Sequence, residues 1–179
     1  KHLGRHIGQT AGLDELARLL GLPKPPKFIE SYDISNTDGQ DNVAGMVVFK
    51  DGKPYKQDYK KFKIKSFSGQ DDFRSMAEVI ERRFNEYKNA ETADGFGRLP
   101  DLILLDGGKG QLSAVTKVLN QMEINVPVFG MVKDSKHKTR AVTGDGGEIA
   151  IKANRSAYTL VSAIQEEVHR FAIGYHRKA

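Results

Sequence analysis

Cysteine is absent from the 179-residue chain. Its absence excludes a disulfide framework, a thiolate zinc site and a cysteine nucleophile. Any metal ion must then be held by aspartate, glutamate or histidine, and these ligands favour hard ions such as Mg²⁺ or Mn²⁺. Long hydrophobic runs are also missing: none approaches the roughly 20 residues that span a bilayer, and the chain does not open with a charged and apolar signal segment. We therefore expect a cytoplasmic protein with no membrane partner.

Positive charge slightly exceeds negative charge, with 28 lysines and arginines against 23 aspartates and glutamates and a formal net charge of +5. This excess is compatible with a polyanionic partner but is shared by many unrelated proteins. The basic residues gather in three clusters: Lys60, Lys61, Lys63 and Lys65; Lys133, Lys136, His137, Lys138 and Arg140; and Arg170, His176, Arg177 and Lys178. Each cluster alone is equally well explained as a solvated surface, but three of them beside an acidic site favour a nucleic-acid partner.

Residues 1–27 differ in pattern from the rest of the chain. The segment 13–20 has apolar residues at helical spacing, and Gly21 is placed to end that helix. The proline-rich stretch 23–27 cannot continue a helix and forms a stiff linker. We therefore predict an N-terminal helical appendage with its linker at 1–27 and one domain over 28–179.

The remaining chain alternates segments typical of strands and helices. Apolar and alternating patterns predict strands at 28–35, 42–50, 55–64, 102–106 and 127–133, with a short extra strand at 148–152. Helical spacing predicts helices from Asp71 or Asp72, at about 111–122 and at about 156–175, and the polar, glycine-rich residues 134–147 predict a loop. Three antiparallel strands followed by crossover helices give an α/β fold with a five-stranded mixed sheet flanked by helices, the order of the ribonuclease H-like architecture. There the first strand is central and the fourth lies parallel beside it.

Two aspartates stand on these predicted strands. Asp33 lies within the first strand, among aromatic and aliphatic residues, and Asp106 ends the fourth. A buried carboxylate is costly unless a cation or several donors face it. If the two strands are neighbours, Asp33 and Asp106 lie close together, and like charges that close need a metal ion between them. The alternative is a pair of capping or turn-forming aspartates, which the strand order disfavours.

The stretch LILLDGGKGQL, which contains Asp106, has features of both a phosphate loop and a metal site. A Walker A loop needs a hydroxyl residue after its lysine and a glycine five positions before the second glycine. Here Gly110 follows Lys109, and Ile103 stands five positions before Gly108, so the nucleotide-loop interpretation fails on both counts. The stretch then predicts an aspartate metal ligand, glycines that let a phosphodiester backbone approach closely, and a lysine that contacts a phosphate.

His169 is a third candidate, at the edge of the apolar stripe of the predicted last helix. A lone helical histidine is more often a structural residue, but ribonuclease H-like nucleases commonly carry their last ligand on this helix. Near pH 7, imidazole can act as a metal ligand or as a general acid or base. Glu166 and Glu167 are rival ligands that the sequence alone does not exclude.

Six stretches together resemble the C-terminal endonuclease half of UvrC, the incising subunit of bacterial nucleotide excision repair. They are FIESYDIS (28–35), NVAGMVVF (42–49), DDFRSMAEVIERRF (71–84), LPDLILLDGGKGQL (99–112), MVKDSKHKTR (131–140) and EEVHRFAIGYHR (166–177). The resemblance covers residues 10–179. It implies a catalytic set of Asp33, Asp106 and His169 and metal-dependent incision of the damaged strand on the 5′ side. Asn36 departs from the histidine expected after the D-I-S motif.

The resemblance also implies the cofactor and the partners. We expect Mg²⁺ or Mn²⁺ at Asp33, Asp106 and His169, and damaged duplex DNA as the substrate. Flanking phosphates are expected to contact Lys109, Lys136, Lys138 and Arg155. The family's GIY-YIG region, UvrB-binding segment and helix-hairpin-helix domain are not found in the chain. We therefore expect a monomer that meets the UvrB–DNA complex through parts of the full-length protein absent here.

Two other functions are compatible with the fold class. One is a non-catalytic ribonuclease H-like module that binds nucleic acid through its basic clusters. Such a module should have lost one of the three candidate residues, and none is lost. The other is a related nuclease, such as a Holliday-junction resolvase or an Argonaute-type enzyme, against which the LDGGKGQ block argues. The number of metal ions and the role of His169, as ligand or as acid and base, stay open.

Overall fold

The computed structural model describes residues 2–36, 42–65 and 71–177, and the side chains of 11–36, 42–65 and 71–174. Its elements are α1 (His2–Leu20), β1 (Phe28–Ser35), β2 (Val43–Lys50), β3 (Lys53–Pro54), η1 (Lys56–Asp58), β4 (Lys60–Lys63), α2 (Asp72–Asn89), η2 (Gly95–Gly97), β5 (Leu102–Leu105), α3 (Lys109–Gln121), β6 (Val128–Lys133), β7 (Thr139–Gly144), β8 (Gly147–Ala150) and α4 (Arg155–Arg177). No helix among the described residues has both the length and the apolar content that a membrane crossing requires.

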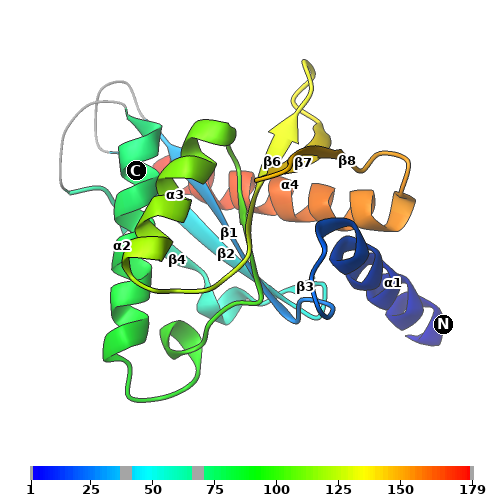
Figure 1. Cartoon of the computed structure of the whole chain (residues 1–179), viewed down its shortest axis with the longest axis horizontal. Helices are drawn as coiled ribbons and strands as arrows, with labels where there is room; N and C mark the ends of the chain where they lie inside the picture. Colours follow the sequence, from blue (N-terminus) through cyan, green and yellow to red (C-terminus); the bar gives the residue numbers. More distant parts are fainter. Residues whose placement is uncertain (1, 37–41, 66–70, 178–179) are drawn as a thin grey trace.

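The strands form one mixed sheet in the order β3-β2-β1-β5-β6-β7-β8, with β4 also paired to β2 (Figure 1). β1 pairs antiparallel with β2 and parallel with β5, and β5 pairs parallel with β6. The predicted fold class is confirmed, with the first strand central and β5 parallel beside it. Within the described residues the sheet has eight strands rather than five, because β3 is a separate short strand and β7 and β8 form a hairpin on the β6 edge.

Two predicted segments differ from the structure. Residues 55–64 do not form a single strand, because β3 pairs with the end of β2, β4 pairs with its beginning, and η1 spans the distance between them. Pro54, which has no N–H to donate, ends β3. β7 lies within the stretch predicted to be a loop. Its pairing with β6 and β8 therefore outweighs a local composition that does not favour a strand.

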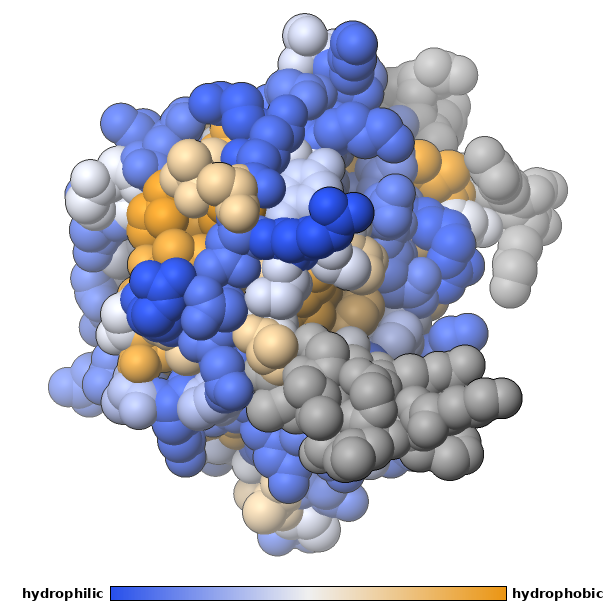
Figure 2. Space-filling view, turned by 90° about the vertical axis from the view of Figure 1, so that its right-hand side faces the viewer, coloured by the Kyte–Doolittle hydropathy of each residue, from blue (hydrophilic) through white to orange (hydrophobic). Residues whose placement is uncertain are grey.

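Helices cover both faces of the sheet: α2 and α3 lie on one side, α1 and α4 on the other (Figure 1). Successive side chains of a strand point to opposite faces. In β2, Met46 and Val48 accordingly pack toward α2 and α3, whereas Val47 and Phe49 pack toward α1 and α4. Because both faces are covered, the inner strands have continuous apolar runs in the sequence. The outer face of the molecule drawn in Figure 2 carries mostly hydrophilic side chains.

α1 belongs to the core on the α4 side. Leu13, Leu16 and Leu20 are buried in the same cluster as Leu160 and Ile164 of α4. The helix predicted at the N-terminus is confirmed and begins earlier than its apolar pattern, at His2. The division of the chain into an appendage and a domain at residue 27 stays a prediction.

Gly45 sets how closely α4 approaches the sheet. It pairs with Asp33 across β2 and β1, and a Cβ atom at residue 45 would lie 3.1 Å from Cα and Cβ of Ala172 in α4. At that separation a neighbour must move, so a larger side chain would push the helix outward. The missing side chain therefore lets α4 lie close to Asp33.

A buried ion pair joins β1 to α2. Arg83 is fully buried, and its guanidinium donates to both carboxylate oxygens of Glu30 over 3.0 and 2.8 Å. It also donates to the backbone oxygens of Phe96 and Arg98, and the Tyr32 hydroxyl donates to Glu30 over 2.6 Å. Both buried charges are therefore paired and extensively hydrogen-bonded, which a buried ion pair requires.

Removing one side of this pair should be costly. Glu30→Gln leaves the Arg83 charge buried without a counter-charge, and we expect the free energy of unfolding to fall by about 3–5 kcal/mol. The control is Glu148→Gln. Glu148 accepts two hydrogen bonds from Arg140 in an ion pair on the surface, where the two side chains are 47% and 45% exposed. Its loss should stay below about 1 kcal/mol. Urea unfolding followed by circular dichroism measures both variants, and equal losses would contradict the role assigned to burial.

Candidate active site

Strand register places Asp33 and Asp106 side by side. In the parallel pairing of β1 and β5, Tyr32 lies beside Leu105, and the two aspartates follow one residue further on. Both point to the face that α4 covers, like Leu104 two positions before Asp106. They are buried, with 8% and 9% of their surfaces exposed. The structure therefore brings the two predicted aspartates together at the end of two central strands.

His169 completes the cluster from α4. Its Nδ1 atom lies 3.1 Å from Oδ2 of Asp33, and its side chain is 52% exposed. One potential ligand atom from each of Asp33, Asp106 and His169 lies within 4.8 Å of the other two. His169 precedes Ala172, the residue that lies against Gly45, by about one helical turn. The close approach of α4 to the sheet thus brings the imidazole to the carboxylates.

Asp106 is oriented by a short chain of side chains. Gln165 Nε2 donates to Asp106 Oδ1 over 3.0 Å, and the Thr139 hydroxyl donates to Gln165 Oε1. Because a donor faces the amide oxygen, the amide nitrogen is directed at the carboxylate. Lys133 Nζ lies 3.1 Å from Asp106 Oδ2, but this buried oxygen has no hydrogen-bond partner of good geometry among the described residues. The lysine therefore contributes charge rather than a well-directed hydrogen bond, and Oδ2 can face a further cation.

The electrostatics of the pair also favour another cation. Burial raises the pKa of Asp33 from 3.8 to about 8; the negative charge of Asp106 adds to the rise, and the Lys133 ammonium opposes it. Near neutral pH the cluster therefore retains a proton when no other cation is present. A divalent ion would take the place of that proton, so its affinity should increase with pH.

The donor set fits a hard divalent ion. Two carboxylates and one imidazole supply the oxygen and nitrogen ligands that Mg²⁺ and Mn²⁺ accept. The Oδ2 atom of Asp106 is buried without a hydrogen-bond partner, and the exposed His169 leaves the cluster open to solvent. Among the described residues, this is the group of three or more acidic or histidine side chains that could hold an ion.

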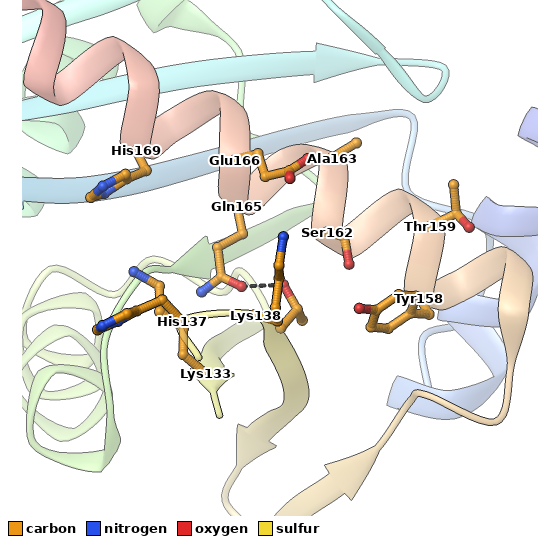
Figure 3. Close-up of a pocket in the computed structure, with 11 residues that line it drawn as sticks. Lys133, His137, Lys138, Tyr158, Thr159, Ser162, Ala163, Gln165, Glu166 and His169 are labelled. Atoms are coloured by element: carbon orange, nitrogen blue, oxygen red, sulfur yellow. Dashed lines mark hydrogen bonds between the residues drawn. The ribbon is translucent and has the colours of Figure 1, made fainter. Parts of the chain in front are cut away.

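A pocket of about 500 Å³ lies beside the cluster, between α4 and the turn at 134–138 (Figure 3). His169 and Lys133 lie at one end of it and Tyr158 lies at the other. Lys138 extends from the turn toward α4 (Figure 3). The pocket is therefore continuous with the side chains that contact the two aspartates.

The four predicted phosphate contacts lie at different distances from the cluster. Lys138 lines the pocket, and Lys136 is exposed on the same turn. Lys109 is the exposed first residue of α3, close after the end of β5. Arg155 begins α4, about 20 Å along the helix axis from His169. Of the four, Lys138 lies in the pocket beside the cluster, and Arg155 lies far from it.

Two of the three glycines that follow β5 lie against other side chains. A Cβ atom at Gly107 would collide with the Gln111 side chain, and one at Gly110 would collide with the Phe73 ring. At Gly108 no atom lies within 4 Å of the corresponding position. The predicted role of these glycines as clearance for a phosphodiester backbone stays a prediction for Gly107, Gly108 and Gly110.

The rival acidic ligands on α4 lie outside the cluster. Glu167 accepts hydrogen bonds from the Tyr59 hydroxyl and from Arg170, over 2.7 and 2.8 Å. Glu166 is exposed and lines the pocket. Of the acidic and histidine side chains considered on this helix, only His169 joins the two aspartates within the described part of the chain.

Sequence reasoning gave no site role to Lys133, Gln165 or Thr139. Lys133 is the last residue of β6, and β6 pairs with β5, which Asp106 follows. A lysine at the end of a strand next to the one that Asp106 follows was the feature of the sequence that could have identified it. Gln165 is a buried polar residue four positions before His169 and so lies on the same side of α4. Thr139 carried no usable signal, because its position depends on the pairing of β7 with β6.

The raised pKa of Asp33 predicts a pH-dependent stability without added metal. The folded pKa of about 8 exceeds the unfolded value of 3.8. Between these values the folded state holds a proton that the unfolded state has lost, so the free energy of unfolding should fall as pH rises. Asp33→Asn should remove this fall and stabilise the protein at pH 8 by about 1–3 kcal/mol, the usual cost of a buried group without full compensation.

Urea unfolding in EDTA, followed by circular dichroism because the chain has no tryptophan, measures this difference. The internal control is the same pair of proteins at pH 5, where the difference should shrink. A gain that is equal at both pH values would contradict the assignment to Asp33 ionisation.

The fold resembles that of human ENDOV, with a TM-score of 0.51, 9% sequence identity and 89% of each chain covered. At that identity the likeness concerns the fold alone. In sequence, the chain is 51% identical over 174 residues to the UvrABC system protein C of Caldanaerobacter subterraneus subsp. tengcongensis. It is 46% identical over 179 residues to the UvrABC system protein C of Finegoldia magna.

These alignments cover 92% and 99% of the chain but 28% and 29% of the two relatives. The chain thus spans less than a third of the length of the curated relatives it matches. Residues 17–173 match the UvrC RNase H endonuclease domain, a range that contains Asp33, Asp106 and His169. The chain therefore belongs to the UvrC RNase H endonuclease domain family.

Proposed function

We propose that this chain is a divalent-metal-dependent DNA endonuclease domain that hydrolyses a phosphodiester bond. The observation that carries the proposal is the cluster of Asp33, Asp106 and His169, with one ligand atom of each within 4.8 Å of the others. Mg²⁺ or Mn²⁺ is the proposed ion, since the cluster offers carboxylate and imidazole ligands. Membership of the endonuclease-domain family supports the reaction class.

The residues of the cluster and its neighbours have different proposed roles. Asp33 and Asp106 would hold the ion, which when bound would offset charge on the scissile phosphate and acidify the attacking water. Gln165 keeps Asp106 in one orientation through its 3.0 Å hydrogen bond. Lys133, 3.1 Å from Asp106, supplies a fixed positive charge where a phosphate would develop negative charge during hydrolysis.

His169 can support this reaction in two ways. Its Nδ1 lies 3.1 Å from Asp33, so the imidazole can share an ion with that carboxylate or exchange a proton with it. The half-exposed ring is also accessible to water and substrate. Both roles, metal ligand and proton carrier, are compatible with this geometry. Loss of the ring should lower metal affinity if His169 is a ligand and leave it unchanged if His169 only transfers a proton.

Lysines of two segments are proposed to hold the DNA. Lys109 is the first residue of α3, three positions after Asp106, and Lys136 and Lys138 lie on the turn between β6 and β7. Contacts to phosphates of this kind position a strand without reading its sequence. Arg155, further along α4, would contact a more distant phosphate.

In the longer protein we propose that this domain makes the 5′ incision beside a lesion during nucleotide excision repair. Its similarity to UvrABC system protein C over nearly the whole chain supports this role. Contacts with a UvrB–DNA complex would come from other parts of that protein, because the chain spans less than a third of its relatives. The domain itself is proposed to act as a monomer, since one chain supplies all three residues of the cluster.

Asp33→Ala and Asp106→Ala test the metal site. Each should reduce Mn²⁺-dependent nicking of supercoiled plasmid by about 100-fold or more, because several kcal/mol of charge stabilisation are lost. Isothermal titration with Mn²⁺ should show lost binding in both variants, and circular dichroism should show a retained fold.

Asp14→Asn is the control for charge alone, since Asp14 is exposed on α1 and lies outside the cluster. It should bind Mn²⁺ and nick DNA like the wild-type chain. Wild-type nicking by either alanine variant, or a wild-type chain that binds no Mn²⁺, would refute the proposed site.

His169→Ala separates the two roles of the imidazole. We expect it to weaken Mn²⁺ binding by about tenfold, a typical effect of losing a group that supports a metal site, and to slow nicking at saturating Mn²⁺. The control is His137→Asn, which removes a second pocket histidine at a positive φ that asparagine tolerates. Its Mn²⁺ affinity should not change. Unchanged affinity of His169→Ala, with slower nicking, would reject the ligand role and leave proton transfer.

A further inference from the structure

The pocket between α4 and the 134–138 turn has the size of a small-ligand site. Its volume is about 500 Å³, within the range of roughly 300–1,000 Å³ typical of such sites. One nucleotide fits a space of this size, whereas a DNA duplex does not. Figure 3 shows that the pocket is walled by side chains of α4 on one side and of the turn on the other.

This pocket is connected to the metal-binding cluster through shared residues. Three of its lining side chains also contact the aspartates: His169 contacts Asp33, and Gln165 and Lys133 contact Asp106, all at 3.0–3.1 Å. A phosphodiester bound at the two aspartates therefore has the pocket directly beside it. The neighbouring nucleotide of the same strand must pass into or over this space.

The charge of the walls suits a phosphate. Lys133 and Lys138 line the pocket together with His137 and His169, and Glu166 is the acidic residue among the lining side chains. The positive groups lie at the cluster end and on the turn (Figure 3). Phosphate oxygens are the usual partners of such groups in DNA-binding proteins.

The α4 wall offers groups suited to a sugar or a base. Ser162 Oγ is buried and has no hydrogen-bond partner among the described residues, which is unusual for a buried hydroxyl. The hydroxyls of Tyr158 and Thr159 lie on the same wall, and the Tyr158 ring provides an aromatic surface at the far end. The hydroxyls of Tyr158 and Thr159 can donate to or accept from a nucleotide, and an aromatic ring can stack on a base.

The opposite wall is a tightly constructed turn. Asp134 accepts hydrogen bonds from the backbone N–H groups of Lys136 and Lys138, over 2.8 and 3.0 Å. His137 is held at a φ of 64°, a left-handed conformation that is uncommon outside glycine. Such strained backbone persists only where its surroundings fix it and is frequent at binding sites. The turn thus holds Lys138 in a defined position opposite α4.

We propose that this pocket binds one nucleotide of the DNA strand, immediately adjacent to the phosphodiester held at Asp33 and Asp106. Its phosphate contacts Lys138 and Lys133, and its sugar or base contacts Thr159 and Tyr158. The proposal rests on the proposed nuclease function and adds a substrate subsite to it.

Ala163→Trp tests the subsite by filling it. Ala163 is exposed and lines the pocket without a charge or a hydrogen bond to lose. The probe is a fluorescein-labelled (dT)8 oligonucleotide in Ca²⁺, with binding measured by fluorescence anisotropy. We expect Kd to rise about tenfold, the amount typical for losing contact with one nucleotide. The control is Asn85→Trp on the exposed side of α2, which should keep the wild-type Kd.

Lys138→Gln provides a second test that does not change the pocket volume. It should weaken (dT)8 binding and reduce the slope of log Kd against log salt by about 0.7, the value for one released counterion on a single strand. Because the chain has no tryptophan, the emission of the introduced indole shows whether Ala163→Trp fills the pocket. A blue shift relative to Asn85→Trp is expected.

Mn²⁺ titration separates this proposal from the proposed function. We expect Ala163→Trp and Lys138→Gln to bind Mn²⁺ like the wild-type chain while binding (dT)8 more weakly. If both variants bind (dT)8 with the wild-type Kd and salt slope while the wild-type chain binds Mn²⁺, the subsite is refuted and the nuclease function stands. If the wild-type chain binds no Mn²⁺, the nuclease function fails, and the subsite fails as a nuclease subsite with it.

Discussion

The parallel pairing of β1 with β5 puts two carboxylates of like charge side by side in a buried position, and the surrounding structure is organised around that constraint. Burial and mutual repulsion raise the pKa of Asp33. Two neighbours partly compensate this negative charge. The Lys133 ammonium lies 3.1 Å from Asp106, and the Gln165 side chain donates a hydrogen bond to Asp106. Neither neutralises the pair fully, so a site with this electrostatic imbalance is suited to hold a divalent ion.

A single helix supplies most of what surrounds the pair. α4 lies close to the sheet because Gly45 has no side chain, and residues at spacings of three and four positions then share one side of the helix. Ser162, Gln165 and His169 follow that spacing, so one surface of α4 supports Asp106, contacts Asp33 and forms the wall of the pocket. Small outward movements of α4 would therefore disturb the candidate metal site and the pocket together.

Local patterns in the sequence were sufficient to predict that Asp33 and Asp106 lie on neighbouring parallel strands, because apolar runs mark the buried strands and helical spacing marks the helices between them. They were not sufficient for residues whose position depends on pairing between distant segments. β7 was missed because its pairing, and not its composition, makes it a strand. Lys133 and Gln165 were missed because their partner, Asp106, is identified only once the register of β5 and β6 and the docking of α4 are known. The distance of Arg155 from the cluster, by contrast, follows from the predicted last helix, because 14 positions separate Arg155 from His169, or about 20 Å of helix.

β1 carries two buried carboxylates, Glu30 and Asp33, whose surroundings differ. Glu30 points toward α2, where the buried Arg83 binds both of its oxygens and neutralises it within the fold. Asp33, three residues later on the opposite face, has a half-exposed histidine and a second carboxylate as its neighbours. Both groups are buried, but only Glu30 forms an ion pair with a buried guanidinium. This difference in surroundings is what makes Asp33, and not Glu30, a candidate ligand for a cation from solution.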